Sequence, residues 1–150
     1  MRKAITETLD HTPVVLDLDG YDRIRARSSE KLNAEIQRRA EEEVQNYSKE
    51  NKAVISQRIE ELDREWDVDR AIMVVFSCLT PISVTLGVKR SRKWFGLFVI
   101  QLSFLVLHAI RGWCPPTSLL RRMGFRSRFE IDAEKFALKT LRGDFKSLTV

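Results

Sequence analysis

The sequence contains few of the residues that carry metal or thiol chemistry. Its 150 residues include two cysteines and two histidines, whereas a metal site usually needs three or four ligands. We therefore expect no metal centre and no cofactor. Cys78 falls inside one apolar run and Cys114 at the end of another; a disulfide requires Cα atoms within about 7 Å, so no intrachain bond is predicted. No catalytic set of side chains is recognisable, and we expect no enzymatic activity.

Other absences exclude further classes of protein. No segment after residue 28 reads as a strand, so the sequence predicts an all-α fold. The pI is high, about 9.5, but no basic-aromatic platform or known reader motif accompanies it, so nucleic acid is not an expected partner. The start Met1-Arg2-Lys3 is basic but no apolar run follows, so no secretory signal is expected.

The most informative absence is that of charge from two long runs. Residues 71–88 and 94–110 contain no charged side chain, and the five residues between them, 89–93, hold four charges. At about 1.5 Å per residue each run makes about 26–27 Å of helix, near the lower limit for a hydrocarbon core of about 30 Å. We predict two transmembrane helices, about 71–88 and 94–112, joined by a tight turn. A soluble hairpin of this composition would need an apolar partner surface that the polar remainder of the chain does not provide.

Residues of the kind that anchor a helix at a membrane surface mark both ends of these runs. An indole ring prefers the headgroup level, and a basic side chain is attracted to anionic lipid. The predicted anchors are Trp66, Trp94 and Trp113, with Lys89, Arg90, Arg92 and Lys93 in the turn. Charge is also segregated, with a net −4 in residues 1–70 and +9 in residues 71–150. A bilayer with anionic headgroups is therefore the expected partner.

The chain divides into four predicted segments. Residues 1–27 look irregular, and residues 28–67 form a charged amphipathic helical arm with a break near 46–51. This arm fits a solvated helix, a coiled coil or a helix lying on lipid. Residues 68–126 form the transmembrane hairpin and an interfacial turn, in which Leu119 and Leu120 are expected to face lipid, and Arg121 and Arg122 the headgroups. Residues 127–150 form a C-terminal amphipathic helix and a tail, beginning at a capping box.

Two spans place both termini on one side of the membrane. The positive-inside rule compares basic residues near the span ends. Four lie in the turn, whereas eight lie on the terminal side, namely Arg58, Arg64, Arg70, Arg111, Arg121, Arg122, Arg126 and Arg128. The count favours cytoplasmic termini, although the dense packing of basic residues in the turn argues for the opposite orientation.

Polar residues in the second run have two interpretations. Gln101 and His108 are seven residues apart and share a helix face, with Arg111 close to it. They can form a polar track that ends at Cys114, or they can hydrogen-bond hydroxyls of the neighbouring helix while Arg111 reaches a lipid phosphate. Cys114 is likewise either a thiol activated by nearby positive charge or a packed thiol at a helix end.

Asp69-Arg70 and Gly112-Trp113-Cys114-Pro115 resemble the bacterial YgaP-like inner-membrane domain family, a two-helix module of unknown function. Its members enter the first helix through an acidic residue plus Arg and leave the second through Gly-x-Cys-Pro. A Leu-Leu/Gly stretch follows, matched by Leu119, Leu120 and Gly124. The resemblance covers about residues 66–126 and departs from the family at Pro116. It implies a bacterial inner-membrane module with cytoplasmic arms. Some relatives carry a sulfur-transferring rhodanese domain, but no Cys-centred anion-binding loop is recognisable in this sequence, so that activity is not expected.

The sequence thus predicts a multi-pass inner-membrane protein that serves as a non-enzymatic anchor or as an accessory or assembly subunit. Two helices bury little area alone, so a homo-oligomer or a subunit of a larger complex is expected. Two alternatives remain: a sulfur-relay or redox protein that uses Cys114, and a small oligomeric transporter lined by Gln101 and His108.

Overall fold

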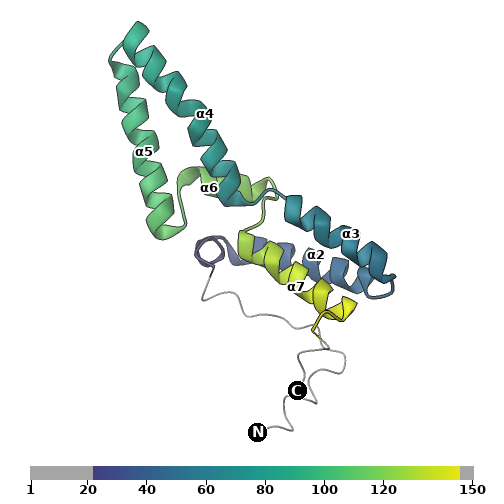
Figure 1. The fold of residues 1–150 in the computed structure, drawn as a ribbon. Helices are drawn as coiled ribbons and strands as arrows, with labels where there is room; N and C mark the ends of the chain where they lie inside the picture. The colour runs from purple at the N-terminus through teal and green to yellow at the C-terminus, as the bar shows by residue number, and fades with distance from the viewer. Residues whose placement is uncertain (1–21, 146–150) are drawn as a thin grey trace.

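The computed structural model describes residues 22–145, and these residues are helical apart from short connections (Figure 1). They contain no strand and a single isolated bridge, between Asp67 and Arg126. The all-α prediction is therefore confirmed for this part of the chain. Its elements are η1 (Arg25–Arg27), α2 (Glu30–Tyr47), α3 (Lys52–Arg64), α4 (Val68–Lys89), α5 (Lys93–Arg111), α6 (Pro115–Arg122) and α7 (Arg128–Arg142).

Helices α4 and α5 are long and apolar enough to cross a membrane. Their 22 and 19 residues correspond to about 33 and 28 Å of helix, slightly more than the uncharged runs alone. Only 28% and 11% of their most apolar windows are buried within the chain, whereas the core helix of a soluble protein is mostly buried. The two helices therefore expose large apolar side chains along most of their length, among them Met73, Ile82, Val88, Val99, Ile100, Val106 and Ile110.

Local chemistry sets the ends of the two helices. Asp67 is the N-cap of α4, and its Oδ1 accepts from the Arg70 backbone N–H at 2.8 Å. Helix α4 continues through Pro81. Helix α5 ends where Gly112 adopts a left-handed conformation, with φ 68°. The two prolines after Cys114 do not end this span; they fill the first positions of α6, where a missing N–H costs nothing.

The side chains of α4 that face α5 differ in size along the helix. Near the turn these residues are small: Ser83 and Gly87 are buried, and a Cβ on Gly87 would lie 3.0 Å from the Phe95 ring. Near the base they are large, namely Ile72 and Phe76. The two helices are accordingly close at the turn and further apart at the base, where α6 lies across them (Figure 1).

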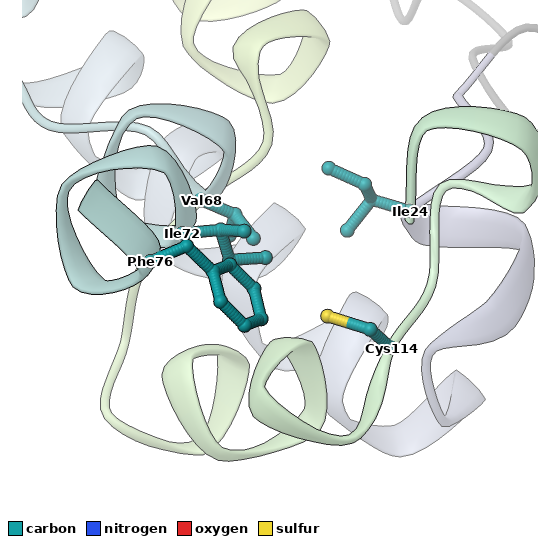
Figure 2. Packing of buried hydrophobic residues seen from close by; sticks show 5 residues of the cluster. All are labelled: Ile24, Val68, Ile72, Phe76 and Cys114. Atoms are coloured by element: carbon teal, nitrogen blue, oxygen red, sulfur yellow. The ribbon is translucent and has the colours of Figure 1, made fainter. Parts of the chain in front are cut away.

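An apolar cluster fills the base of the hairpin. Val68, Ile72 and Phe76 of α4 pack with Ile24, near the start of the described residues, and with Cys114, which precedes α6. Figure 2 shows Ile24 and Cys114 pointing toward the α4 side chains from the facing side. This part of the predicted irregular segment is therefore ordered, whereas residues 1–21 and 146–150 lie outside the described residues.

The two predicted arms pack together as a three-helix bundle. Helix α7 contacts both α2 and α3, and its Ile131 and Leu138 pack on Ile55, Ile59 and Leu62 of α3. The apolar stripe of residues 28–67 is thus covered by the C-terminal helix, a pairing that sequence analysis did not identify. The break near 46–51 is confirmed, and the second helix is capped by Asn51. The Ser127–Glu130 capping box is also confirmed.

Helix α6 joins the hairpin to the bundle through its buried face. This face consists of Cys114, Thr117 and Arg121, which recur at helical spacing and are at most 1% exposed. The expectation that Arg121 faces lipid headgroups is therefore wrong, because the guanidinium points into the protein. Leu120 packs on the apolar cluster at the hairpin base, and only Leu119 of the leucine pair is exposed.

The Arg121 guanidinium has five N–H donors, and each finds an acceptor. Its Nε donates to Ser28 Oγ at 3.2 Å. Its Nη1 donates to Glu130 Oε2 at 2.5 Å and to the Phe125 carbonyl at 3.4 Å. Its Nη2 donates to Glu130 Oε1 at 2.9 Å and to Asn33 Oδ1 at 2.8 Å. One side chain of α6 therefore holds α2, α7 and the loops that lead into them.

A second ionic group fixes α3 and α4 against α7. Arg126 donates to both carboxylate oxygens of Glu65, at 2.7 and 2.5 Å, and to Glu134. Glu134 also accepts from Arg58 at 3.0 Å. Burial acts to lower the pKa of Arg126, but its hydrogen bonds to Glu65 and Glu134 outweigh this effect and raise the pKa. The Val68 N–H also donates to the Arg126 carbonyl at 3.0 Å, at the first residue of α4.

The segment at residues 22–24 ties the bundle to the end of α5. The buried Asp22 carboxylate accepts from the Ile24 N–H at 2.9 Å and from the Ser127 hydroxyl. Arg23 donates to the Ala109 carbonyl at 3.0 Å, and its Cβ lies 2.5 Å from the position that a Cβ on Gly112 would take. Gly112 is therefore required both for its left-handed backbone and for this close approach.

We predict a graded effect of alanine at three glycines. Gly112→Ala combines left-handed strain with a backbone clash and should destabilise the protein by more than the ~1–2 kcal/mol expected for strain alone. Gly124→Ala adds a Cβ at φ 96° with nothing within 4 Å, so it isolates the strain. Gly96→Ala, inside α5 with open space around it, is the matched control and should be neutral or stabilise by up to ~1 kcal/mol, because Ala favours a helix over Gly. Thermal unfolding in detergent measures all three; equal melting temperatures for Gly112→Ala and Gly96→Ala would contradict the packing described.

Candidate functional site at the base of the hairpin

A chain of hydrogen bonds runs from the surface to the buried thiol of Cys114. His108 on α5 contacts Asp69 Oδ1 on α4 through Nε2, at 2.8 Å. Its Nδ1 lies 3.3 Å from Thr117 Oγ1 on α6, which in turn lies 3.2 Å from Cys114 Sγ. The Asp69 side chain is 45% exposed, whereas Cys114 is fully buried. Three helices thus contribute to one continuous polar path.

The contact with Asp69 sets the direction of the donors and acceptors in this chain. Thr117 Oγ1 already accepts from the Cys114 backbone N–H at 3.1 Å. In one arrangement the thiol donates to Thr117, Thr117 donates to Nδ1, and Nε2–H donates to Asp69. The reverse arrangement, with Nδ1–H donating to Thr117 and the Thr117 hydroxyl donating to the sulfur, would leave the unprotonated Nε2 of the neutral ring facing the Asp69 carboxylate with no hydrogen between them. The contact with Asp69 therefore favours the first arrangement.

The surroundings of Cys114 bear directly on its chemistry. Its sulfur has no exposed surface and packs among apolar residues of the hairpin base. Its backbone begins α6, where the Thr117 side chain reaches back to the Cys114 N–H. This arrangement gives the thiol a packing and capping role. Exchange with a soluble thiol would require α6 to move away from α4. Cys78, in contrast, lies exposed on the side of α4.

Gln101 lies between the two long helices, well away from His108. Its amide faces Ser83 Oγ at 3.3 Å and Thr80 Oγ1 at 3.5 Å, so the predicted bonding to hydroxyls of the neighbouring helix is present. The Ser83 hydroxyl also points at the Thr80 carbonyl, at 2.9 Å. One amide atom, placed as Nε2, is buried with no partner; exchanging the amide O and N would leave the oxygen unpaired instead.

Gln101 and His108 therefore serve separate clusters, and no hydrogen bond within residues 22–145 links the two. Arg111 is exposed, and within the described residues it has no hydrogen bond to either side chain. The polar track proposed from the sequence is divided into two local networks. Groups of three or more metal-ligating side chains are also not found in the described part of the chain.

The remaining predicted site residues lie at the two ends of the hairpin. Trp66 is 53% exposed, and Trp113 is half-buried, with its indole N–H donating to Ser118 Oγ at 3.0 Å. Both are near the base, whereas Trp94 is near the turn and is 36% exposed. The basic residues 89, 90, 92 and 93 are all exposed. Of the family-motif residues, Arg70 is exposed, Gly112 is buried against Arg23, and Pro115 opens α6.

Sequence reasoning missed three residues that organise the site. Asp22 had a local signal, since an Asp side chain often bonds the backbone two residues on. Thr117 and Arg121 lie on the same helix face as Cys114, at i, i+3 and i+7, and that spacing could have predicted a buried face. No local pattern identified the partners of Arg121, because three of its four partner residues lie in other helices or at their starts.

We predict that the Thr117 hydroxyl is required for the base of the hairpin. Thr117→Val keeps the side-chain shape but leaves the buried Cys114 N–H and His108 Nδ1 without a partner, which should cost about 1–3 kcal/mol. Thr117→Ser retains the hydroxyl and should cost clearly less. Unfolding in detergent measures both, and a Val variant as stable as the Ser variant would show that the chain of hydrogen bonds contributes nothing to stability.

Comparison of the chain with known protein families, with curated proteins and with solved structures finds no match in any of the three. The resemblance to the YgaP-like domain stays a prediction that rests on the residues quoted for it.

Proposed function

We propose that this chain is a non-enzymatic membrane anchor that holds a charged helical bundle at the membrane surface for a partner to bind. The observation that carries the proposal is the contrast between its two halves. Helices α4 and α5 leave most of their apolar residues exposed, while α2, α3 and α7 bury their apolar stripes against each other. The buried ion pair between Arg121 and Glu130 joins α6, at the base of the hairpin, to α7 of the bundle.

The distribution of exposed residues supports insertion of the hairpin. A lipid environment removes the cost of exposing the apolar faces of α4 and α5 to water. Tryptophans lie near both ends of the hairpin, at the positions that a headgroup layer favours. The exposed basic residues of the turn are placed to meet phosphates on the far side.

A bacterial inner membrane with cytoplasmic termini is the location we propose. The resemblance of Asp69-Arg70 and Gly112–Pro115 to the YgaP-like module supports the membrane. The excess of basic residues beside the base of the hairpin supports the orientation. The bundle would then lie in the cytoplasm.

A role in anchoring fits the way in which the polar groups are used. Asp69, His108, Thr117 and Cys114 bond to one another, and the Arg121 guanidinium is saturated by protein acceptors. These groups hold helices together. Each has a structural partner, so none requires a substrate to complete its bonding.

The bundle offers an apolar surface on α7 for a partner. Phe129 is 48% exposed, Phe136 is 39% exposed and Leu141 is 44% exposed, on a helix otherwise rich in charge. Phe129 and Phe136 are seven residues apart and share one face. Exposed aromatic side chains of this kind are enriched at protein interfaces. The partner is either a second copy of the chain or another subunit.

The test is to extract the full chain from bacterial membranes in mild detergent and to determine what stays bound. The parent should resist alkaline extraction, as an inserted protein does, and should run as a complex larger than a monomer. Phe129→Ser/Phe136→Ser should remain in the membrane but lose the partner, because both changes lie on the α7 surface. Inside the chain the double variant loses the contact between the Phe136 and Phe145 rings.

Lys49→Ser/Glu50→Ser, at the exposed connection between α2 and α3, is the matched control and should retain the complex. A parent released by alkali would refute insertion. A membrane-bound parent that is monomeric and free of partners would refute the anchoring role alone.

A further inference from the structure

A groove opens between the start of α2 and helix α6, at the base of the hairpin. It has a volume of about 330 Å³. One wall comes from Trp113, Ser118 and Arg122, and the other from Lys31 and Leu32. Trp113 comes two residues after the last residue of α5, so the groove begins within one helical turn of the end of that helix. The groove therefore lies where an inserted hairpin would leave the hydrocarbon core.

The lining of the groove combines an apolar floor with hydroxyl groups. The Trp113 ring is half-buried, and its N–H is held by Ser118 Oγ at 3.0 Å, which fixes the ring in the wall. Leu32 is half-buried on the opposite side. Such a surface suits a ligand with methylene groups next to a polar head.

Two basic side chains without an ion-pair partner lie at the rim of the groove. Lys31 and Arg122 are exposed, and within residues 22–145 neither makes an ion pair or a side-chain hydrogen bond. Glu35 also lines the groove, but Arg38 and Arg39 donate to it at 2.9 and 2.8 Å. These bonds lower the pKa of Glu35, and the two guanidinium groups offset its charge. The groove therefore presents net positive charge to a ligand.

We propose that this groove binds one anionic phospholipid from the leaflet around the hairpin. Its phosphate lies between Lys31 and Arg122, and its glycerol and first methylenes pack on Trp113 and Leu32. Charge complementarity and the position of the groove beside the lipid-exposed end of α5 select a phospholipid. This inference rests on the proposed insertion of the hairpin, so its test must separate the failure of one from the failure of the other.

Quenching of tryptophan fluorescence by brominated lipid measures the occupancy directly. The variant Trp66→Phe/Trp94→Phe keeps Trp113 as the single tryptophan, and both replaced rings are on the surface. It is placed in phosphatidylcholine nanodiscs that contain a small fraction of brominated phosphatidylglycerol or of brominated phosphatidylcholine. We expect the anionic lipid to be enriched beside Trp113 by at least about fivefold, the attraction that one Lys or Arg provides near an anionic surface.

The two basic residues at the rim of the groove are then replaced, and the result is compared with a control that removes the same charge elsewhere. Adding Lys31→Ala and Arg122→Ala should abolish the preference for the anionic lipid. Adding Lys89→Ala and Lys93→Ala, which removes the same charge at the turn, should leave it unchanged. Equal quenching by the two lipids, or loss of the preference in the turn variant, would overturn the proposed site.

A second single-tryptophan variant, Trp66→Phe/Trp113→Phe, reports on insertion alone, because Trp94 lies near the turn. If brominated phosphatidylcholine quenches Trp94 but neither lipid quenches Trp113, the hairpin is inserted and the lipid site is wrong. If neither tryptophan is quenched by either lipid, insertion itself is wrong, and the proposed site falls with it.

Discussion

The buried guanidinium of Arg121 is the interaction on which the arrangement of this protein depends. Removing a cation from water costs several kcal/mol unless each of its donors is satisfied. Here all five are satisfied, by Glu130, Asn33, Ser28 and the Phe125 carbonyl. Those acceptors come from α2, α7 and the loops before them. Because Arg121 itself belongs to α6, the position of α6 and that of the bundle are determined together.

The geometry of the hairpin follows from the same constraint. Helix α6 lies across the base of α4 and α5 (Figure 1), where its inward face contributes Cys114 and Thr117. The bulky residues Ile72 and Phe76 hold the two long helices apart at that end, and Gly87 lets them approach near the turn. Thr117 then occupies the position where His108 and Cys114 both reach its hydroxyl. The sequence predicted an interfacial turn after the second span. In the structure this segment is α6, which connects the hairpin to the three-helix bundle.

The sequence predicted what depends on local pattern and failed where distant segments meet. The two long helices follow from runs without charge, the break before α3 from a shift of the apolar stripe near residues 46–51, and the capping box from Ser127 and Glu130. Arg121 was assigned to headgroups because an arginine beside leucines usually faces water. Its burial requires Glu130 and Asn33, and their proximity is a property of the tertiary fold. The role of Ile24 was missed for the same reason, since it packs on residues far along the chain.

The central claim is that a buried ion pair fixes the bundle rigidly to the hairpin. The most direct measurement is the distribution of distances between spin labels at Arg92→Cys, beside the turn, and Lys49→Cys, in the bundle. The exposed Cys78 is replaced by alanine, and the buried Cys114 is retained.

In lipid nanodiscs the parent should give a single narrow distribution of distances between the two labels. Arg121→Met should broaden it, because Glu130 loses both hydrogen bonds to the guanidinium, while it keeps the Ser127 N–H and the more distant Arg25. Breaking a buried ion pair of this kind costs up to about 3–5 kcal/mol. Arg142→Met, which removes an ion pair to Asp144 and a hydrogen bond to Ser56 within the bundle, should leave it narrow, because neither contact involves the hairpin. A distribution as narrow in Arg121→Met as in the parent would contradict the claim.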